Sequence, residues 1–158
     1  MKVKWLLLIG WMLIIFLFSA QTGEQSSESS GLVEQLLSIF SFIPNRIFGL
    51  ELQLLIRKAA HFTEYLILYV LMFNVMINHQ SLKKSLVYTL VGVFLYACTD
   101  EIHQAFVPGR ACTFIDVLID TSGGVMAMSL IWIINQSYLS MLLWKKFHFN
   151  FTKKKCKI

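Results

Sequence analysis

The chain has 158 residues, of which 56% are hydrophobic and only 15% are charged. Soluble globular proteins carry about 25% charged residues, so this composition excludes an ordinary soluble domain and indicates a protein crossed by membrane helices. The formal net charge is +5, but the basic residues mostly flank apolar segments, so we expect no nucleic-acid partner.

The first apolar segment covers about residues 5–20 and follows two lysines. It resembles a signal peptide in length, but a cut after Ala20 would place Phe18 at the third position before the cut. Signal peptidase sites need a small residue there. We therefore expect an uncleaved membrane anchor.

A long loop follows the first segment. Residues 21–30, QTGEQSSESS, have the composition of a polar turn. Over residues 31–43 apolar side chains recur at helical spacing, with polar side chains on the other face. This pattern predicts an amphipathic helix that ends near Pro44. Such a helix would lie on the outer membrane surface or cap the bundle.

Three further apolar segments cover about residues 59–77, 86–103 and 114–134. Each is near the roughly 20 residues that a helix needs to cross hydrocarbon, and helices satisfy their own backbone groups there. The predicted fold class is therefore all-α: one integral membrane domain over residues 1–158, a bundle of about four transmembrane helices with an amphipathic outer-loop helix. The basic, aromatic tail, residues 136–158, is predicted to be an interfacial segment attracted to anionic lipid, or a plain topology signal.

Lysine and arginine placement predicts the orientation. With an even number of spans, the N-terminal lysines, the pair Lys83 and Lys84 and the lysine-rich tail all fall on one side, which we assign to the cytoplasm. We therefore expect a multi-pass protein of the plasma membrane with cytoplasmic N- and C-termini. The outer side then receives the loops 21–57 and 104–113.

Charged residues of the apolar segments gather toward this outer side. Asp120 would lie roughly 10 Å below the start of the fourth segment, and carboxylates at such depth usually face a bundle interior or a watery cavity. His61 and Glu64 are three residues apart on one helix, as are Asp100 and His103. Three cations are available on the same side: Arg57, Lys58 and Arg110.

These residues define a candidate ligand-binding or functional cluster, whose catalytic members, if any, the pattern does not identify. Its members are Lys58, His61, Glu64, Tyr65, Asp100, Glu101, His103, Gln104, Arg110, Asp116 and Asp120. Such a set can bind an anion through arginine, bind a cation through carboxylates, or satisfy itself as an ion-pair network that locks the helices together. The spacing resembles carboxylate-bridged metal bundles, but the order is reversed in one motif and the full set is absent. We therefore expect no metal and no cofactor.

Four motifs in the chain are characteristic in their spacing: S-x-Q-x-G-x-x-S from Ser19, K-x-x-H-x-x-E-Y from Lys58, D-E-x-H-Q-x-x-x-x-G-R from Asp100 and D-x-x-x-D-x-x-G from Asp116. In these motifs, and over most of the chain from about residue 5 to residue 132, the sequence resembles the VanZ-like family of bacterial membrane proteins. The resemblance implies a bacterial cell-envelope protein. The family's namesake is associated with low-level resistance to the lipoglycopeptide teicoplanin, so a contribution to antibiotic resistance is an implied role.

The functional hypothesis that we favour is a non-enzymatic protein whose outward-facing site binds an anionic lipid or a lipid-linked cell-wall or glycopeptide ligand. Arg110 and Lys58 would hold phosphate, and membrane lipids would be its partners. The alternative is an intramembrane enzyme acting on a lipid-linked substrate at the outer leaflet, with His61 or His103 as general base. A third hypothesis is a transporter that uses Asp120 and His61 as relay groups. The sequence predicts no particular oligomeric state.

Overall fold

The computed structural model describes residues 1–39, 46–47 and 50–155, and their side chains as far as Tyr138 except for Ser38 and Ile47. Within these residues the chain forms five helices and one short hairpin. The helices are α1 (Lys2–Ser19), α2 (Gly23–Ser38), α3 (Leu52–Met76), α4 (Leu82–Gln104) and α5 (Phe114–Lys155). The hairpin pairs β1 (Arg46–Ile47) with β2 (Leu50–Glu51) in antiparallel register. The predicted all-α fold class is confirmed.

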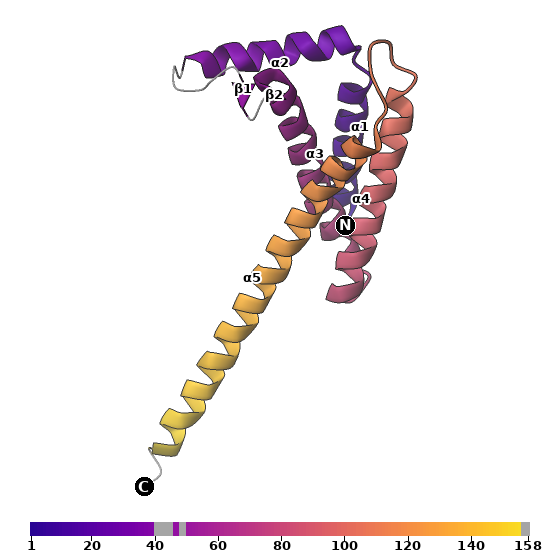
Figure 1. Cartoon of the computed structure of the whole chain (residues 1–158). Helices are drawn as coiled ribbons and strands as arrows, with labels where there is room; N and C mark the ends of the chain where they lie inside the picture. Colours follow the sequence, from indigo (N-terminus) through magenta and orange to yellow (C-terminus); the bar gives the residue numbers. More distant parts are fainter. Residues whose placement is uncertain (40–45, 48–49, 156–158) are drawn as a thin grey trace.

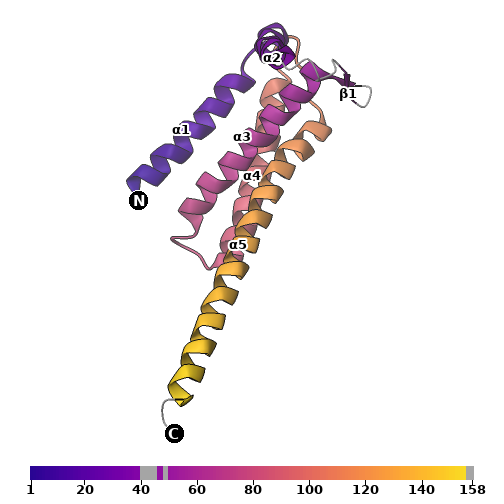
Figure 2. The same ribbon diagram turned by 90° about the vertical axis from the view of Figure 1, so that its left-hand side faces the viewer.

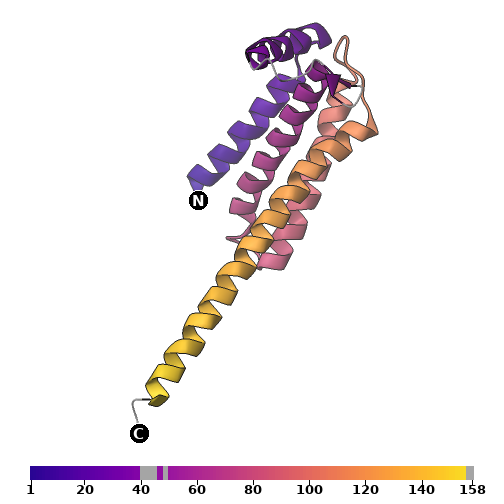
Figure 3. The same ribbon diagram turned by 60° about the vertical axis from the view of Figure 1, so that its left-hand side comes forward.

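Four helical segments are long and apolar enough to cross a membrane: α1, α3, α4 and the Phe114–Tyr138 part of α5. They run side by side as a bundle (Figures 2 and 3). The ranges predicted for the second and third spans, 59–77 and 86–103, were too short, because hydropathy detects only the apolar part of a helix. In the structure, α3 begins at Leu52 and α4 at Leu82, and the added residues include the basic pairs Arg57–Lys58 and Lys83–Lys84.

Helix α5 also continues beyond its predicted span. It runs as one helix to Lys155, and its C-terminal part projects away from the bundle (Figures 1 and 3). The tail expected from residue 136 onward is therefore helical through Lys155. Its interfacial position stays a prediction.

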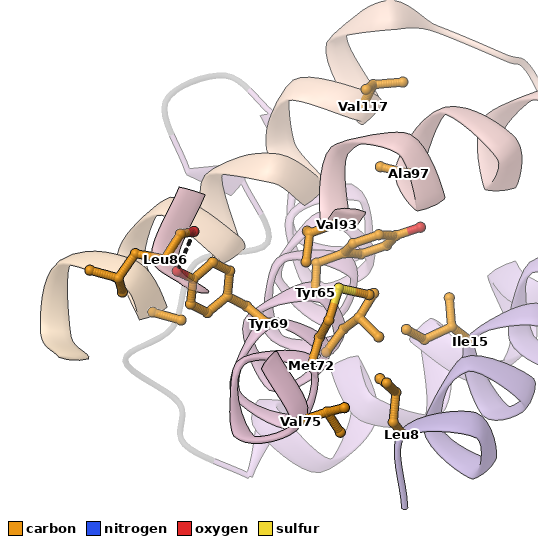
Figure 4. Packing of buried hydrophobic residues seen from close by; sticks show 12 residues of the cluster. Leu8, Ile15, Tyr65, Tyr69, Met72, Val75, Leu86, Val93, Ala97 and Val117 are labelled. Carbon is orange, nitrogen blue, oxygen red and sulfur yellow. Dashed lines mark hydrogen bonds between the residues drawn. The ribbon is translucent and has the colours of Figure 1, made fainter. Parts of the chain in front are cut away.

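The interior of the bundle is built mainly on α3. Tyr65, Leu68 and Tyr69 are fully buried, and they pack against Val93 of α4 and Ile15 of α1 (Figure 4). The Tyr69 hydroxyl donates a hydrogen bond of 3.0 Å to a backbone carbonyl of α4. This apolar core fixes how α1, α3 and α4 are turned toward one another, and so fixes which of their polar residues meet above it.

Helix α2 lies across one end of the bundle (Figure 1). It begins at Gly23, so residues 21–30 are not the polar turn that the composition suggested. Thr22 and Gln25 form a capping box: the Thr22 hydroxyl accepts from the Gln25 amide at 3.3 Å, and the Gln25 side chain accepts from the Thr22 amide at 3.1 Å. The polar stretch is therefore the start of the helix. Its predicted end near Pro44 lies outside the described residues.

The faces of α2 explain its position. Ser26 and Ser30 are buried against the bundle, whereas Leu32 and Leu36 are 63% and 65% exposed. The helix therefore covers the bundle end with small polar residues and turns its apolar side chains outward. Of the two positions that the sequence left open, the structure shows the cap over the bundle. The position on the membrane surface stays a prediction, which the outward apolar face would suit.

The start of α2 is fixed to the loop between α4 and α5. The Gly23 amide donates a hydrogen bond of 3.0 Å to the Pro108 carbonyl. Gly109 adopts a φ of 73°, which glycine tolerates and other residues rarely adopt. A side chain at Gly23 would overlap the Gly109 carbonyl. Two glycines thus allow this loop and α2 to meet over the polar end of the bundle.

Candidate functional site

The predicted cluster lies at the end of the bundle that α2 covers. Its residues come from the first turns of α3, the last turns of α4, the loop that follows, and the first turns of α5. The structure therefore brings together side chains that are up to about 60 positions apart in the chain, as the predicted topology required. Within this end of the bundle they divide into three groups with different partners.

The first group is buried at the junction of α3, α4 and α5. A ring nitrogen of His61 and carboxylate oxygens of Asp100 and Asp120 all lie within 4.8 Å of one another. Asp100 is 4% exposed and Asp120 is fully buried. His61 Nδ1 lies 3.5 Å from Asp120 Oδ1, and Gln104 Nε2 donates a hydrogen bond of 3.1 Å to Asp100 Oδ2. The deep carboxylate of the fourth span therefore faces the bundle interior, as its depth predicted.

The second group fixes the start of α5. Lys58 forms an ion pair with Asp116, and both side chains are partly exposed. Thr113 occupies the cap position of the helix: its hydroxyl donates to Asp116 at 2.7 Å and accepts from the Asp116 amide at 3.2 Å. The Thr113 amide in turn donates to the Glu101 carboxylate at 3.0 Å. Lys58, Asp116 and Glu101 therefore hold α3, α4 and α5 together.

The third group is Arg110 and the end of α1. Arg110 Nε donates a hydrogen bond of 3.1 Å to the Gln21 carbonyl, and one of its terminal nitrogens donates to the Phe18 carbonyl at 3.2 Å. The last carbonyls of a helix have no partners within it, and a cation there also interacts favourably with the helix dipole. Arg110 thus caps α1, a role that the sequence analysis did not assign to it.

Two cavities adjoin these groups. A cavity of about 20 Å³ lies among His61, Asp116, Asp120 and Glu101. A larger cavity of about 330 Å³ lies between α2 and α3, and apolar surface makes up most of its lining. Arg57, His61 and Arg110 line both cavities. The two cavities therefore share one imidazole and two guanidinium groups in their linings.

Three predicted residues have other surroundings. His103 turns toward α1. Its ring lies tilted against the ring of Phe16, with the ring centres 4.5 Å apart, and its Nδ1 lies 3.5 Å from the Ser19 hydroxyl. Glu64 lines the larger cavity. Tyr65 is fully buried below the charged groups, and its hydroxyl has no hydrogen-bond partner within the described part of the chain. Asp100 and His103, which are three residues apart on α4, therefore have different partners, and Gln104 is the residue that contacts Asp100.

The sequence analysis missed residues that the structure adds to the site. Arg57 was counted among the available cations but not among the candidates, although it lines both cavities. Ser26, Ser29 and Ser30 line the larger cavity from α2. The motif S-x-Q-x-G-x-x-S pointed to this part of the site. In the order of the motif, Ser19 contacts His103, the Gln21 carbonyl contacts Arg110, Gly23 contacts the 105–113 loop and Ser26 lines the larger cavity.

Comparison with known proteins gives one match. Residues 4–135 match the model of the VanZ/LLP1 family, which confirms the resemblance drawn from the motifs. The chain matches no curated protein and no solved structure. The matched region covers the four spans and every candidate residue, and it ends before the basic tail.

Proposed function

The chain belongs to the VanZ/LLP1 family, and we propose that this membrane protein binds the phosphate group of an anionic lipid or of a lipid-linked ligand between Arg57 and Arg110. The protein acts in the bacterial plasma membrane as part of the cell envelope. The site faces the outer side, and both termini lie in the cytoplasm.

The observation that carries this proposal is the pair of guanidinium groups at the junction of the two cavities. Arg57 has no hydrogen bond or ion pair within the described part of the chain, although it is partly buried. Burial, and then the nearby Arg57, lower the pKa of Arg110, and the carboxylates of Asp100 and Glu101 oppose this effect only in part. Two cations that repel each other beside a cavity form a site for an anion, since arginine binds phosphate with paired hydrogen bonds.

The larger cavity suits the rest of such a ligand. Its volume of about 330 Å³ lies within the range of roughly 300–1,000 Å³ of ligand pockets. Its apolar lining would contact the first part of an acyl or isoprenoid chain. Ser29 and Glu64 would accept or donate hydrogen bonds to hydroxyl groups of the headgroup. The cellular role that this ligand class supports is a contribution to teicoplanin resistance, which the family resemblance implied.

The binding test uses full-length protein purified in detergent and two short-chain probes. Both carry a phosphate group, but dioctanoyl-phosphatidylglycerol has a net negative charge, whereas the choline cation neutralises the phosphate of dioctanoyl-phosphatidylcholine. We expect Arg57→Ala to weaken phosphatidylglycerol binding at least about tenfold, because a lost charge-assisted hydrogen bond costs about 1.5–3 kcal/mol. Binding is measured by calorimetry in parallel for both probes.

The matched control is Arg46→Ala, which removes an arginine that is 72% exposed and pairs only loosely with Glu51 at 3.7 Å. This variant should bind phosphatidylglycerol like the wild type. Equal binding of both probes by the wild type, or equal losses in the two variants, would show that the Arg57 and Arg110 pair does not select an anion.

A second candidate function is an intramembrane enzyme acting on a lipid-linked substrate at the outer leaflet. The observation that favours it is the contact of His61 with the buried Asp120 beside both cavities, because a carboxylate that orients a histidine is typical of general-base catalysis. Mass spectrometry of phosphatidylglycerol incubated with the protein tests this candidate. A product formed by the wild type and lost in His61→Gln would support it, and an unchanged lipid would count against it.

A further inference from the structure

The buried polar atoms around Asp120 lack partners. Both oxygens of Asp120, Nδ1 of His61 and the hydroxyl of Tyr65 are buried without a hydrogen bond within the described part of the chain. Buried polar atoms are almost always hydrogen-bonded, and an uncompensated carboxylate in an apolar interior is costly. Four such atoms on neighbouring helices therefore indicate that something else binds there.

The spacing of these atoms indicates what it is. His61 Nδ1 and Asp120 Oδ1 are 3.5 Å apart, which is longer than the 2.7–3.2 Å of an ordinary N–H···O hydrogen bond. Two ligand atoms that each lie about 2.1 Å from one tetrahedral metal ion are separated by roughly 3.4 Å. Asp100 completes a set of three donors within 4.8 Å. Side-chain movements of a few tenths of an ångström would bring the Asp100 oxygen close enough to the other two donor atoms. Two ligands on opposite sides of one ion are roughly 4.2 Å apart.

The local charge balance agrees with this. Asp100 and Asp120 are two buried carboxylates close together, so a compensating positive charge is needed. Two of the three nearby cations are engaged elsewhere, since Lys58 pairs with Asp116 and Arg110 caps α1. Arg57 lines the cavities but makes no ion pair with either carboxylate in the described structure. A divalent cation would balance both carboxylates and leave His61 neutral, as a metal ligand requires.

We propose that His61, Asp100 and Asp120 bind one divalent transition-metal ion of the Mn²⁺ or Zn²⁺ class. One imidazole with two carboxylates suits these ions, whereas Mg²⁺ and Ca²⁺ prefer oxygen donors alone. Gln104 holds Oδ2 of Asp100 and leaves its other oxygen for the ion, which is the orienting role of neighbours in metal sites. The cavity of about 20 Å³ beside His61 and Asp120 has room for about one water molecule as a fourth ligand.

The site differs from the proposed anion site in its residues. Metal binding is also measured without any added lipid, so its outcome is separate from that of the phosphatidylglycerol test. Full-length protein is purified in detergent with an affinity tag that contains no histidine, stripped with EDTA, and incubated with Mn²⁺ or Zn²⁺. After desalting, elemental analysis by mass spectrometry should find about one ion per chain in the wild type.

Variants locate the ion. His61→Gln and Asp120→Asn should lose it, whereas His103→Gln should retain it, because His103 faces α1. A wild-type protein that retains no stoichiometric ion after reloading would overturn the proposal. Retention of the ion in His61→Gln and Asp120→Asn would also overturn it.

A spectroscopic measurement covers the case in which these variants do not fold, as judged by gel filtration. Pulsed electron paramagnetic resonance of Mn²⁺ bound to the wild type should show modulation from a coordinated imidazole nitrogen, and His103→Gln should keep that signal. Its absence in the wild type would show that no histidine binds the ion, and the proposed ligand set would be wrong.

Discussion

At the residue scale, Arg110 caps α1 and is also part of the proposed anion site. Its guanidinium donates to the carbonyls of Phe18 and Gln21, and an arginine has further N–H groups left for a ligand. We expect Arg110→Ala to lower the stability of the bundle by about 1–3 kcal/mol, since it removes two hydrogen bonds from a charged donor, one to the last turn of α1 and one to Gln21 just beyond it.

Thermal unfolding of the purified protein in detergent measures this effect. Arg110→Lys should recover part of the lost stability, because it restores a cation near the end of α1 without the two-pronged contact. Loss of lipid binding by Arg110→Ala with an unchanged unfolding temperature would contradict the capping role and assign Arg110 to the ligand alone.

The residue scale also shows what the sequence could not predict. The depth of Asp120 sufficed to place it in the interior, but the i,i+3 spacing of Asp100 and His103 did not identify their partners. The structure pairs Asp100 with Gln104, because the position four residues on lies closer to the same helix face, and α1 provides Phe16 for His103. The capping of α1 by Arg110 was not predictable because its partners are backbone carbonyls, which leave no side-chain pattern.

At the scale of the elements, the contact between α3 and α5 depends on Gly123. A methyl group at this position would overlap the Phe62 carbonyl of α3. We expect Gly123→Ala to push the two helices apart, to cost about 1–3 kcal/mol of stability, and to separate His61 from Asp120. Thermal unfolding in detergent measures the first effect, and loss of bound Mn²⁺ or Zn²⁺ measures the second.

Gly10 in α1 provides the control, because nothing lies within 4 Å of a methyl group placed there. Gly10→Ala should leave both measurements unchanged or raise the stability slightly, as alanine favours helices. Equal behaviour of the two variants would show that the close packing of α3 on α5 does not position the site.

At the scale of the elements, hydropathy predicted the spans but not the position of α2. The four spans were predictable, because about 20 apolar residues in a row leave few other structures. The start of α2 was misplaced because polarity was taken as a turn, although Thr22 and Gln25 have the spacing of a capping box. The position of α2 over the cavity depends on the contact of Gly23 with the 105–113 loop. The motif S-x-Q-x-G-x-x-S includes Gly23, but it does not identify the 105–113 loop as the partner of that glycine.

At the scale of the whole molecule, the polar site occupies one end of the bundle and the lysine-rich C-terminal segment the other (Figures 1 and 3). Every role proposed above for a lipid-linked ligand requires that the site face the outer leaflet. The cysteines of the chain allow this orientation to be tested, since exposed Cys112 lies in the loop beside the site and Cys156 follows the end of α5.

We expect a membrane-impermeant maleimide to label Cys112 in intact bacterial cells that produce a variant with Cys98 and Cys156 replaced by alanine. In the matching variant that retains only Cys156, labelling should appear only after the cells are permeabilised. The physical reason is the positive-inside tendency, which predicts that the lysines at the C-terminal end lie in the cytoplasm. The reverse pattern would place Arg57, Arg110 and the whole polar site on the cytoplasmic side, where an outer-leaflet ligand could not reach them.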